Sequence, residues 1–179
     1  SSRPEIKFLT DSTYIVIWSE DAYKQGIYGQ MADTLGNKVD STFILSDTHL
    51  INDIAECFAP DLIDNSSPDT IEFFWIDNRT EKKEIYFRKF AITGTENSES
   101  AMIHSAEDSE TLLRFDAVKG SQNNYHIVYS TKSSEGFYNA HYQIWDSGLK
   151  QIIEKKTLTA RENYTSSKPL IPQRSHHQL

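Results

Sequence analysis

The chain is 179 residues long and is poor in cysteine, glycine and proline, with one, seven and five residues respectively. Because Cys57 is the only cysteine, an intramolecular disulfide framework and a cysteine-rich zinc site are excluded. No apolar run is long enough to cross a membrane as a helix, so we expect no transmembrane segment. A glycine-rich phosphate loop, a Gly-x-Ser-x-Gly elbow and a His-Glu-x-x-His motif are also missing. We therefore predict no cofactor, no metal ion and no catalytic residue.

Positive charge is scarce as well, because 18 Lys and Arg stand against 26 Asp and Glu, which makes the formal net charge −8. Such a charge repels phosphate backbones, so we expect no nucleic-acid partner. Aromatic residues, in contrast, are plentiful: 9 Tyr, 9 Phe and 3 Trp are enough to build a folded core.

The two ends of the chain differ from the rest. The sequence begins Ser1-Ser2-Arg3-Pro4, with no methionine and no apolar signal core, so we expect an end produced by processing, cloning or truncation. The polar stretch 162–179 contains Pro169 and Pro172, and we expect an extended tail there.

A repeated pattern fills the chain between these ends. Trp75 follows Trp18 by 57 positions, and Tyr129 follows Trp75 by 54 positions. Three glycines in polar turns have almost the same spacing, 58 and 54 positions: Gly36, Gly94 and Gly148. Because two independent landmarks keep one period, the sequence predicts three related structural units.

Each unit contains four short segments rich in β-branched and aromatic residues, which predict four strands. The second segment is apolar and ends in Trp or Tyr, as expected for a strand buried on both faces. The turn glycines are expected to supply the positive φ of a tight hairpin. Apolar residues at helical spacing predict one short helix over 51–58. The expected strands are 6–9, 14–18, 26–31 and 42–45, then 62–63, 71–75, 84–90 and 101–103, then 112–115, 125–129, 140–145 and 152–158.

The sequence thus predicts an all-β protein of three four-stranded antiparallel units, which are typical of propeller blades. The predicted boundaries are 1–58 for the first blade with its following loop, 59–110 for the second blade and 111–161 for the third. An ordinary β-sandwich is the alternative. Three blades are too few to close a propeller, since four is the usual minimum. We therefore expect a homo-oligomer that closes the ring, or a chain that is part of a longer protein.

One segment resembles a repeat of bacterial secreted and surface proteins. It reads Trp75-Ile76-Asp77-Asn78-Arg79, followed after a polar loop by Glu84-Ile85-Tyr86-Phe87-Arg88-Lys89-Phe90. Residues 18–39 look like the same repeat, whereas in the third unit Tyr129 replaces Trp and no Asp-Asn-Arg follows it. Such repeats are similar to blades of sialidase-like and TolB-like propellers. The resemblance implies a propeller-type fold and an extracellular or cell-surface location, and no particular activity.

Candidate binding residues lie in the loops that follow the second strand of each unit and in the loops that join the units, which are expected to share one face. Acidic side chains in these loops suit hydrogen bonding to a sugar, and a tyrosine suits stacking on it. Arg79 suits bidentate pairing with a ligand carboxylate, although an Asp-Asn-Arg turn also stabilises itself through local hydrogen bonds. The candidate ligand-binding residues are Asp21, Tyr23, Asp77, Asn78, Arg79 and Tyr138.

Three functions are compatible with this pattern. The first is a non-catalytic binding or adhesion module that recognises a glycan or a protein through the blade loops. The alternatives are a fragment of a propeller-fold glycoside hydrolase and a structural subunit of a larger assembly, which an exposed apolar end blade would support. A hydrolase needs two carboxylates near the ring axis. On the expected inner strands only Asp64 is acidic, which favours the binding module.

Overall fold

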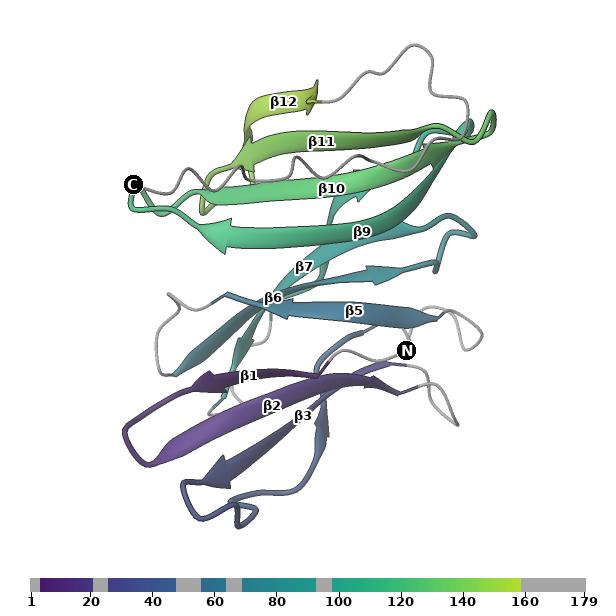
Figure 1. Ribbon diagram of the computed structural model, residues 1–179. Coiled ribbons are helices and arrows are strands. Elements are labelled where there is room, and N and C mark those ends of the chain that lie inside the picture. Colours follow the sequence, from purple (N-terminus) through teal and green to yellow (C-terminus); the bar gives the residue numbers. More distant parts are fainter. Residues whose placement is uncertain (1–3, 21–25, 48–55, 64–68, 93–97, 159–179) are drawn as a thin grey trace, which may run out of the picture.

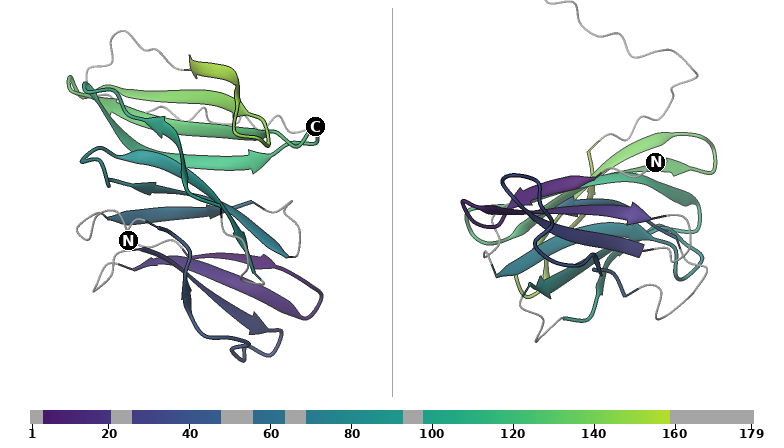
Figure 2. Two further views of the ribbon diagram at one scale, coloured as in Figure 1. Left: turned by 180° about the vertical axis from the view of Figure 1, so that it is seen from behind. Right: turned by 90° about the horizontal axis from the view of Figure 1, so that it is seen from below.

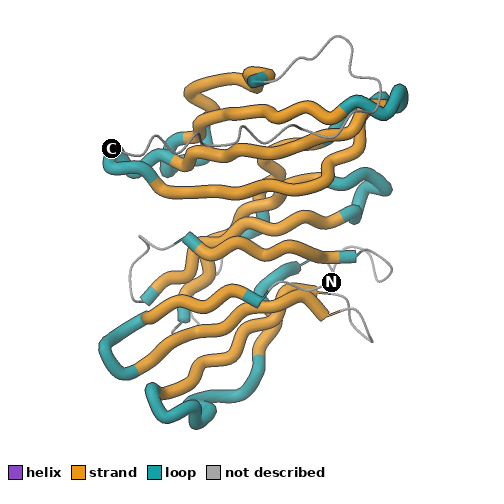
Figure 3. The backbone as a smooth tube through the Cα atoms, in the orientation of Figure 1, coloured by secondary structure: helices purple, strands orange, loops and turns teal. Residues whose placement is uncertain are grey.

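The computed structural model describes residues 4–20, 26–47, 56–63, 69–92 and 98–158. Within these ranges the protein is all-β, with strands and loops and no helix (Figure 3). The described part of the chain accordingly contains no helix that is long and apolar enough to cross a membrane.

The described residues form twelve strands in three antiparallel sheets, and in each sheet four consecutive strands are neighbours in chain order. The first sheet contains β1 (Glu5–Phe8), β2 (Thr13–Glu20), β3 (Gly26–Asp33) and β4 (Phe43–Ile44). The second contains β5 (Cys57–Leu62), β6 (Thr70–Asp77), β7 (Glu84–Ala91) and β8 (Ala101–Ser105). The third contains β9 (Glu110–Lys119), β10 (Tyr125–Ser133), β11 (Tyr138–Trp145) and β12 (Gln151–Thr157).

These sheets confirm the prediction of three four-stranded antiparallel units. The helix predicted over 51–58 is wrong in the part that the structure describes, because Cys57 and Phe58 begin β5 and lie opposite Asp77 and Ile76 of β6. Pairing with a long neighbouring strand outweighs the local helical spacing here. Residues 51–55 lie outside the described residues.

The sheets stack face to face, and the second sheet lies between the first and the third (Figures 1 and 2). Each contact buries an apolar core that a single four-stranded sheet would leave in water. The core between the first and second sheets includes Ile15, Ile17, Ile27, Leu45, Ile71, Phe73, Trp75 and Tyr86. The core between the second and third sheets includes Phe74, Ile76, Ile85, Phe87, Leu112, Tyr125, Ile127 and Tyr129.

Burial along the second strand of each sheet depends on the position of that sheet in the stack. In β6, seven of eight residues are buried, as predicted for a strand covered on both faces. In β2 and β10, buried residues alternate with half-buried or exposed ones, so the same prediction is wrong for these strands. The reason is that an end sheet has only one face packed against another sheet of the chain.

The three-unit repeat is present in the tertiary structure as an aromatic ring pair across the second and third strands of each sheet. The pairs and their centroid distances are Trp18 and Tyr28 at 6.2 Å, Trp75 and Tyr86 at 5.7 Å, and Tyr129 and His141 at 5.0 Å. We call the face that carries this pair the aromatic face of a sheet, and the other its opposite face. The aromatic face of the second sheet packs on the opposite face of the first, and the third sheet packs on the second in the same way.

Two hairpins between third and fourth strands are built alike. Asp33 and Asp146 each accept hydrogen bonds from the backbone N–H groups two and four residues further on. The positive φ falls on the fourth residue of the turn, which is Gly36 in the first sheet (84°) and Leu149 in the third (63°). The prediction that Gly148 supplies this φ is therefore wrong, because this glycine lies one position too early in its turn.

Replacing Gly36 with alanine is expected to lower the free energy of unfolding by about 1 kcal/mol, because an L-residue is strained at this φ. The added methyl group itself meets nothing within 4 Å. Gly148→Ala is the matched control, since it changes the equivalent hairpin at a residue without a positive φ, and we expect at most about half the loss. Urea denaturation measures both, and equal losses would contradict the explanation. The third turn glycine, Gly94, lies outside the described residues.

Candidate functional site

The predicted group Asp77-Asn78-Arg79 lies at the end of β6, and its acidic side chain is buried. The carboxylate of Asp77 accepts hydrogen bonds from the indole Nε1 of Trp75 at 2.9 Å and from Nη2 of Arg79 at 2.6 Å. The backbone N–H of Arg79 donates to the same carboxylate at 3.1 Å. The side-chain oxygen of Asn78 accepts from the backbone N–H of Glu56 at 2.6 Å, which connects this turn to the segment that leads into β5.

Arg79 connects elements that are distant in the sequence. Its Nη2 donates to Asp47, which follows β4, at 3.0 Å, its Nη1 donates to Ser100 at 3.0 Å, and its guanidinium lies 3.9 Å from the ring centre of Tyr86. Burial disfavours the charge, but the hydrogen bond and charge of Asp77 and the charge of Asp47 outweigh it and raise the pKa of Arg79. These contacts match the alternative in which the turn stabilises itself. A role in ligand binding stays a prediction.

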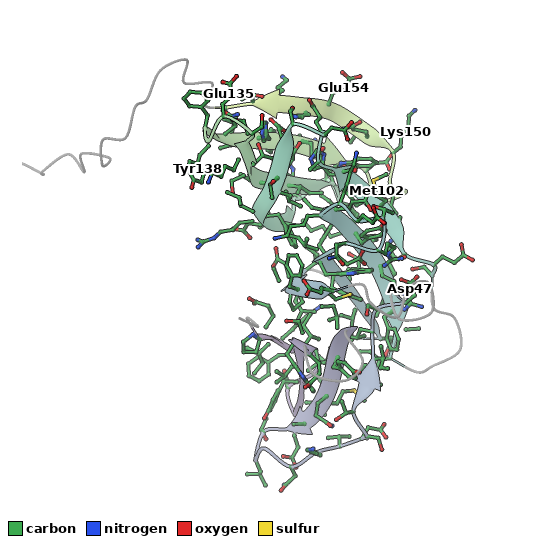
Figure 4. The ribbon with its side chains drawn as sticks, turned by 90° about the vertical axis from the view of Figure 1, so that its right-hand side faces the viewer. Asp47, Met102, Glu135, Tyr138, Lys150 and Glu154 are labelled. Atoms are coloured by element: carbon green, nitrogen blue, oxygen red, sulfur yellow. The ribbon has the colours of Figure 1, made fainter. Side chains whose placement is uncertain are left out.

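The other predicted site residues are not gathered at this turn. Asp21 and Tyr23 lie outside the described residues. Tyr138 is 65% exposed at the start of β11, and the ammonium of Lys132 lies 5.6 Å from its ring centre. Figure 4 shows Tyr138 on the opposite side of the stack from Asp47, which forms an ion pair with Arg79. The structure therefore does not bring Tyr138 and the Asp-Asn-Arg turn into one site.

Two kinds of loop were predicted to share one face, and this is confirmed for the second and third sheets. The β6–β7 loop and the segment that joins β8 to β9 line one cavity of about 320 Å³. Lys82 of the first loop forms an ion pair with Asp108 of the second, while Lys155 donates to Glu107 at 2.8 Å and to Glu110 at 3.2 Å. Because opposite charges are already paired at this cavity, a charged ligand would have to displace them.

A different cavity receives residues from all three sheets. It has a volume of about 360 Å³ and is lined by residues of β1, β5, β9, β10 and β11. We call it the inner groove and refer to it by six of its lining residues: Glu5 of β1, Pro60 and Asp61 of β5, and Arg114, Phe115 and Asp116 of β9. The second and third strands of the third sheet, β10 and β11, also line it.

The three carboxylates of the inner groove occupy the same position in the three sheets. In the strand pairing, the residues opposite them each precede the Trp or Tyr landmark by one position: Ile17 opposite Glu5, Phe74 opposite Asp61, and Val128 opposite Asp116.

The prediction that only Asp64 places a carboxylate on the inner strands is therefore wrong. β1, β5 and β9 extend beyond their predicted ends and include the three acidic residues, whereas Asp64 lies outside the described residues. Their spacing, 56 and 55 positions, matches the repeat and was the available signal.

Irregular strand pairing shapes the inner groove. The three steps from Phe58 to Asp61 on β5 face two steps on β6, so β5 holds one extra residue, and Ala59 within it has a φ of 52°. Pro60, which has no N–H to donate, lies in the same bulge. On β9 one extra residue likewise faces the step from Ser130 to Thr131 of β10. Bulges bend a strand and redirect its side chains, and they are over-represented next to active sites.

The polar groups of the groove differ in how firmly they are held. Oδ2 of Asp61 accepts a hydrogen bond of 2.7 Å from the backbone N–H of Ala117 on β9, at the edge of the third sheet. Asp116 and Arg114 are exposed, and Glu5 is half-buried. The groove thus combines carboxylate acceptors with a guanidinium donor, groups that orient a hydroxyl-rich molecule. Across the described ranges, no three His, Cys, Asp or Glu side chains are grouped so that they could hold a metal ion.

Comparison with known proteins does not add a family to these observations. No protein-family model matches the chain, and no curated protein matches it significantly. The resemblance to propeller repeats therefore rests on residues 18–39, 75–79 and 84–90 alone.

Proposed function

We propose that the chain is a non-catalytic binding module of a secreted or cell-surface protein, with three successive propeller blades and an inner groove that binds a glycan. The observation that carries the proposal is the groove, a single cavity to which all three sheets contribute side chains. The interpretation of the sheets as blades is supported by their packing, because the aromatic faces of the second and third sheets each lie on the sheet before them, as in a propeller.

A saccharide suits the groove chemically. Its hydroxyl groups donate hydrogen bonds to the carboxylates of Glu5, Asp61 and Asp116 and accept them from the guanidinium of Arg114. The ring of Phe115 offers an apolar surface for the C–H face of a sugar. The volume of about 360 Å³ lies within the range of roughly 300–1,000 Å³ that is typical of ligand pockets.

Screening on a glycan array is expected to identify a bound saccharide, and calorimetric titration then measures its affinity. Asp116→Asn and Arg114→Ala are each expected to weaken binding about 10-fold or more, because each removes a hydrogen bond that involves a charged group. Glu154→Gln is the control, since this exposed residue lies on β12, at the edge of the third sheet opposite to β9. An array without a bound glycan, or an affinity that neither groove variant changes, would overturn the proposal.

Glycoside hydrolysis is the second candidate function, and the three groove carboxylates favour it. Glycosidases use two carboxyl groups, one as the acid and one as the base or nucleophile. A hydrolase would release reducing ends from the saccharide that the groove binds, and Glu5→Gln or Asp116→Asn would abolish this release. A binding module releases none, so one assay with the wild-type protein distinguishes the two functions.

A further inference from the structure

The aromatic face of the first sheet lacks the cover that the equivalent faces of the other sheets have. It carries four half-buried residues: Tyr14, Val16, Trp18 and Tyr28. Their equivalents are buried under a preceding sheet: Ile71, Phe73, Trp75 and Tyr86 in the second sheet, and Tyr125, Ile127, Tyr129 and His141 in the third. Figures 1 and 2 show that no described segment lies over this face of the first sheet, which is at one end of the stack.

The first strand of this sheet shows the difference most clearly. Ile6 is 58% exposed, whereas the residues at its position in the other sheets, Leu62 and Ala117, are 8% and 4% exposed. Phe8 is 66% exposed, whereas the residue at its position in the third sheet, Lys119, is half-buried. These equivalences follow from the strand pairing relative to the Trp and Tyr landmarks.

The opposite face of the third sheet is uncovered at the other end of the stack. Val118 is 59% exposed, whereas Ile63, at its position in the second sheet, is 1% exposed. Val128 is likewise exposed, and Phe74, at its position in the second sheet, is fully buried under the third. Each end of the stack therefore presents one half of a contact that occurs twice within the chain.

We propose that a second copy of this chain covers the first sheet, and that it does so with the opposite face of its third sheet. Both halves of the contact are present on one chain, at opposite ends, so the association is heterologous and joins the head of one copy to the tail of the next. Two copies joined at both ends form a closed ring of six sheets, within the roughly four to eight blades that propellers have.

One hydrogen bond is expected across this contact from the junction of the second and third sheets. Inside the chain, the carboxylate of Asp61 accepts from the backbone N–H of Ala117 in the next sheet. Asp116 and Ile6 occupy the same two positions at the ends of the stack. In the assembly, Asp116 of one copy accordingly accepts from the backbone N–H of Ile6 of the other.

Two variants that each block one end test the proposal. Phe8→Glu places a charge on the uncovered face of the first sheet, and Val118→Glu places one on the uncovered face of the third. Both side chains are mostly exposed, so we expect each variant to fold, and the urea midpoint verifies this. Light scattering of the wild type is expected to show the mass rising with concentration from 20.6 kDa to twice that value or more. Each variant alone is expected to stay at 20.6 kDa where the wild type associates.

An equimolar mixture of the two variants is the decisive sample. The intact third sheet of the Phe8→Glu chain meets the intact first sheet of the Val118→Glu chain, so the mixture is expected to form a dimer and nothing larger. Leu35→Glu, at an 86% exposed hairpin tip beside the first sheet, is the control and is expected to associate like the wild type. A monomeric wild type, a single variant that still self-associates, or a mixture that stays monomeric would each overturn the proposal.

Discussion

Replacing Asp77 with alanine is expected to lower the free energy of unfolding by about 3–5 kcal/mol, the loss typical of removing one partner of a buried ion pair. The carboxylate is fully buried and is the closest carboxylate partner of Arg79. Its removal leaves the guanidinium charge of Arg79 undercompensated and takes away the acceptor of the Trp75 indole N–H. Both changes leave buried polar groups with fewer hydrogen bonds, which destabilises the folded state. Urea denaturation followed by tryptophan fluorescence measures the change.

The repeat provides a matched control for this variant. Glu20 lies two residues after Trp18, as Asp77 lies two residues after Trp75, and it accepts from the Trp18 indole at 3.3 Å. Because Glu20 is exposed, Glu20→Ala is expected to cost no more than about 0.5 kcal/mol. Adding Arg79→Met to Asp77→Ala is expected to recover part of the loss, since the uncompensated charge is then absent. Equal losses from the Asp77 and Glu20 variants would show that the buried network contributes little.

Lowering the pH from about 7.5 to about 5 is expected to reduce the stability of the protein by about 2 kcal/mol through His104. This residue of β8 packs with its ring centroid 4.2 Å from that of Tyr129, between the second and third sheets. Burial, and then the positive charges of Lys155 and His141, lower the pKa of His104 to about 4. The unfolded chain takes up this proton near pH 6.5, so it binds more protons than the folded protein between these values. The contribution of His104 to stability is therefore fully present above about pH 6.5 and is lost as the pH falls from there toward about 4.

Urea denaturation at the two pH values measures this effect. His104→Gln is expected to remove most of the pH dependence, although burial also lowers the pKa of His141 and leaves a smaller dependence of the same sign. His126→Gln is the matched control, because His126 lies on the uncovered face of the third sheet, where it bonds to Tyr142. We expect this control to keep the full pH dependence. The assignment is wrong if His104→Gln keeps it as well.

The strands of this protein were predictable from the sequence because a strand leaves a local signal. Segments such as 71–75 and 84–90 are rich in β-branched and aromatic residues, and each corresponds to an observed strand. The errors lie where non-local pairing decides the conformation. Cys57 and Phe58 belong to a segment whose apolar residues have helical spacing, but they form a strand because they pair with β6. The positive φ of the third hairpin falls on Leu149, which also packs against the core between the second and third sheets.

The candidate site was less predictable than the strands. The spacing of Glu5, Asp61 and Asp116 was present in the sequence, but the strand ends that include them were not. Strand ends depend on partners and bulges, which a local pattern does not contain. The partners of Arg79 were equally hidden, because Asp47 and Ser100 are 32 and 21 residues away in the chain.

By itself, the sequence determined that this protein is built from three units of four antiparallel strands, each with an aromatic landmark on its second strand. Alternation along a strand sets which residues share a face, and this is a local property. Only the tertiary structure decided which faces are covered, because a cover comes from a different sheet, formed by residues that are not local in the sequence. For this reason Trp75 is fully buried while Trp18, at the same position of its own sheet, remains half-buried at an open end of the stack.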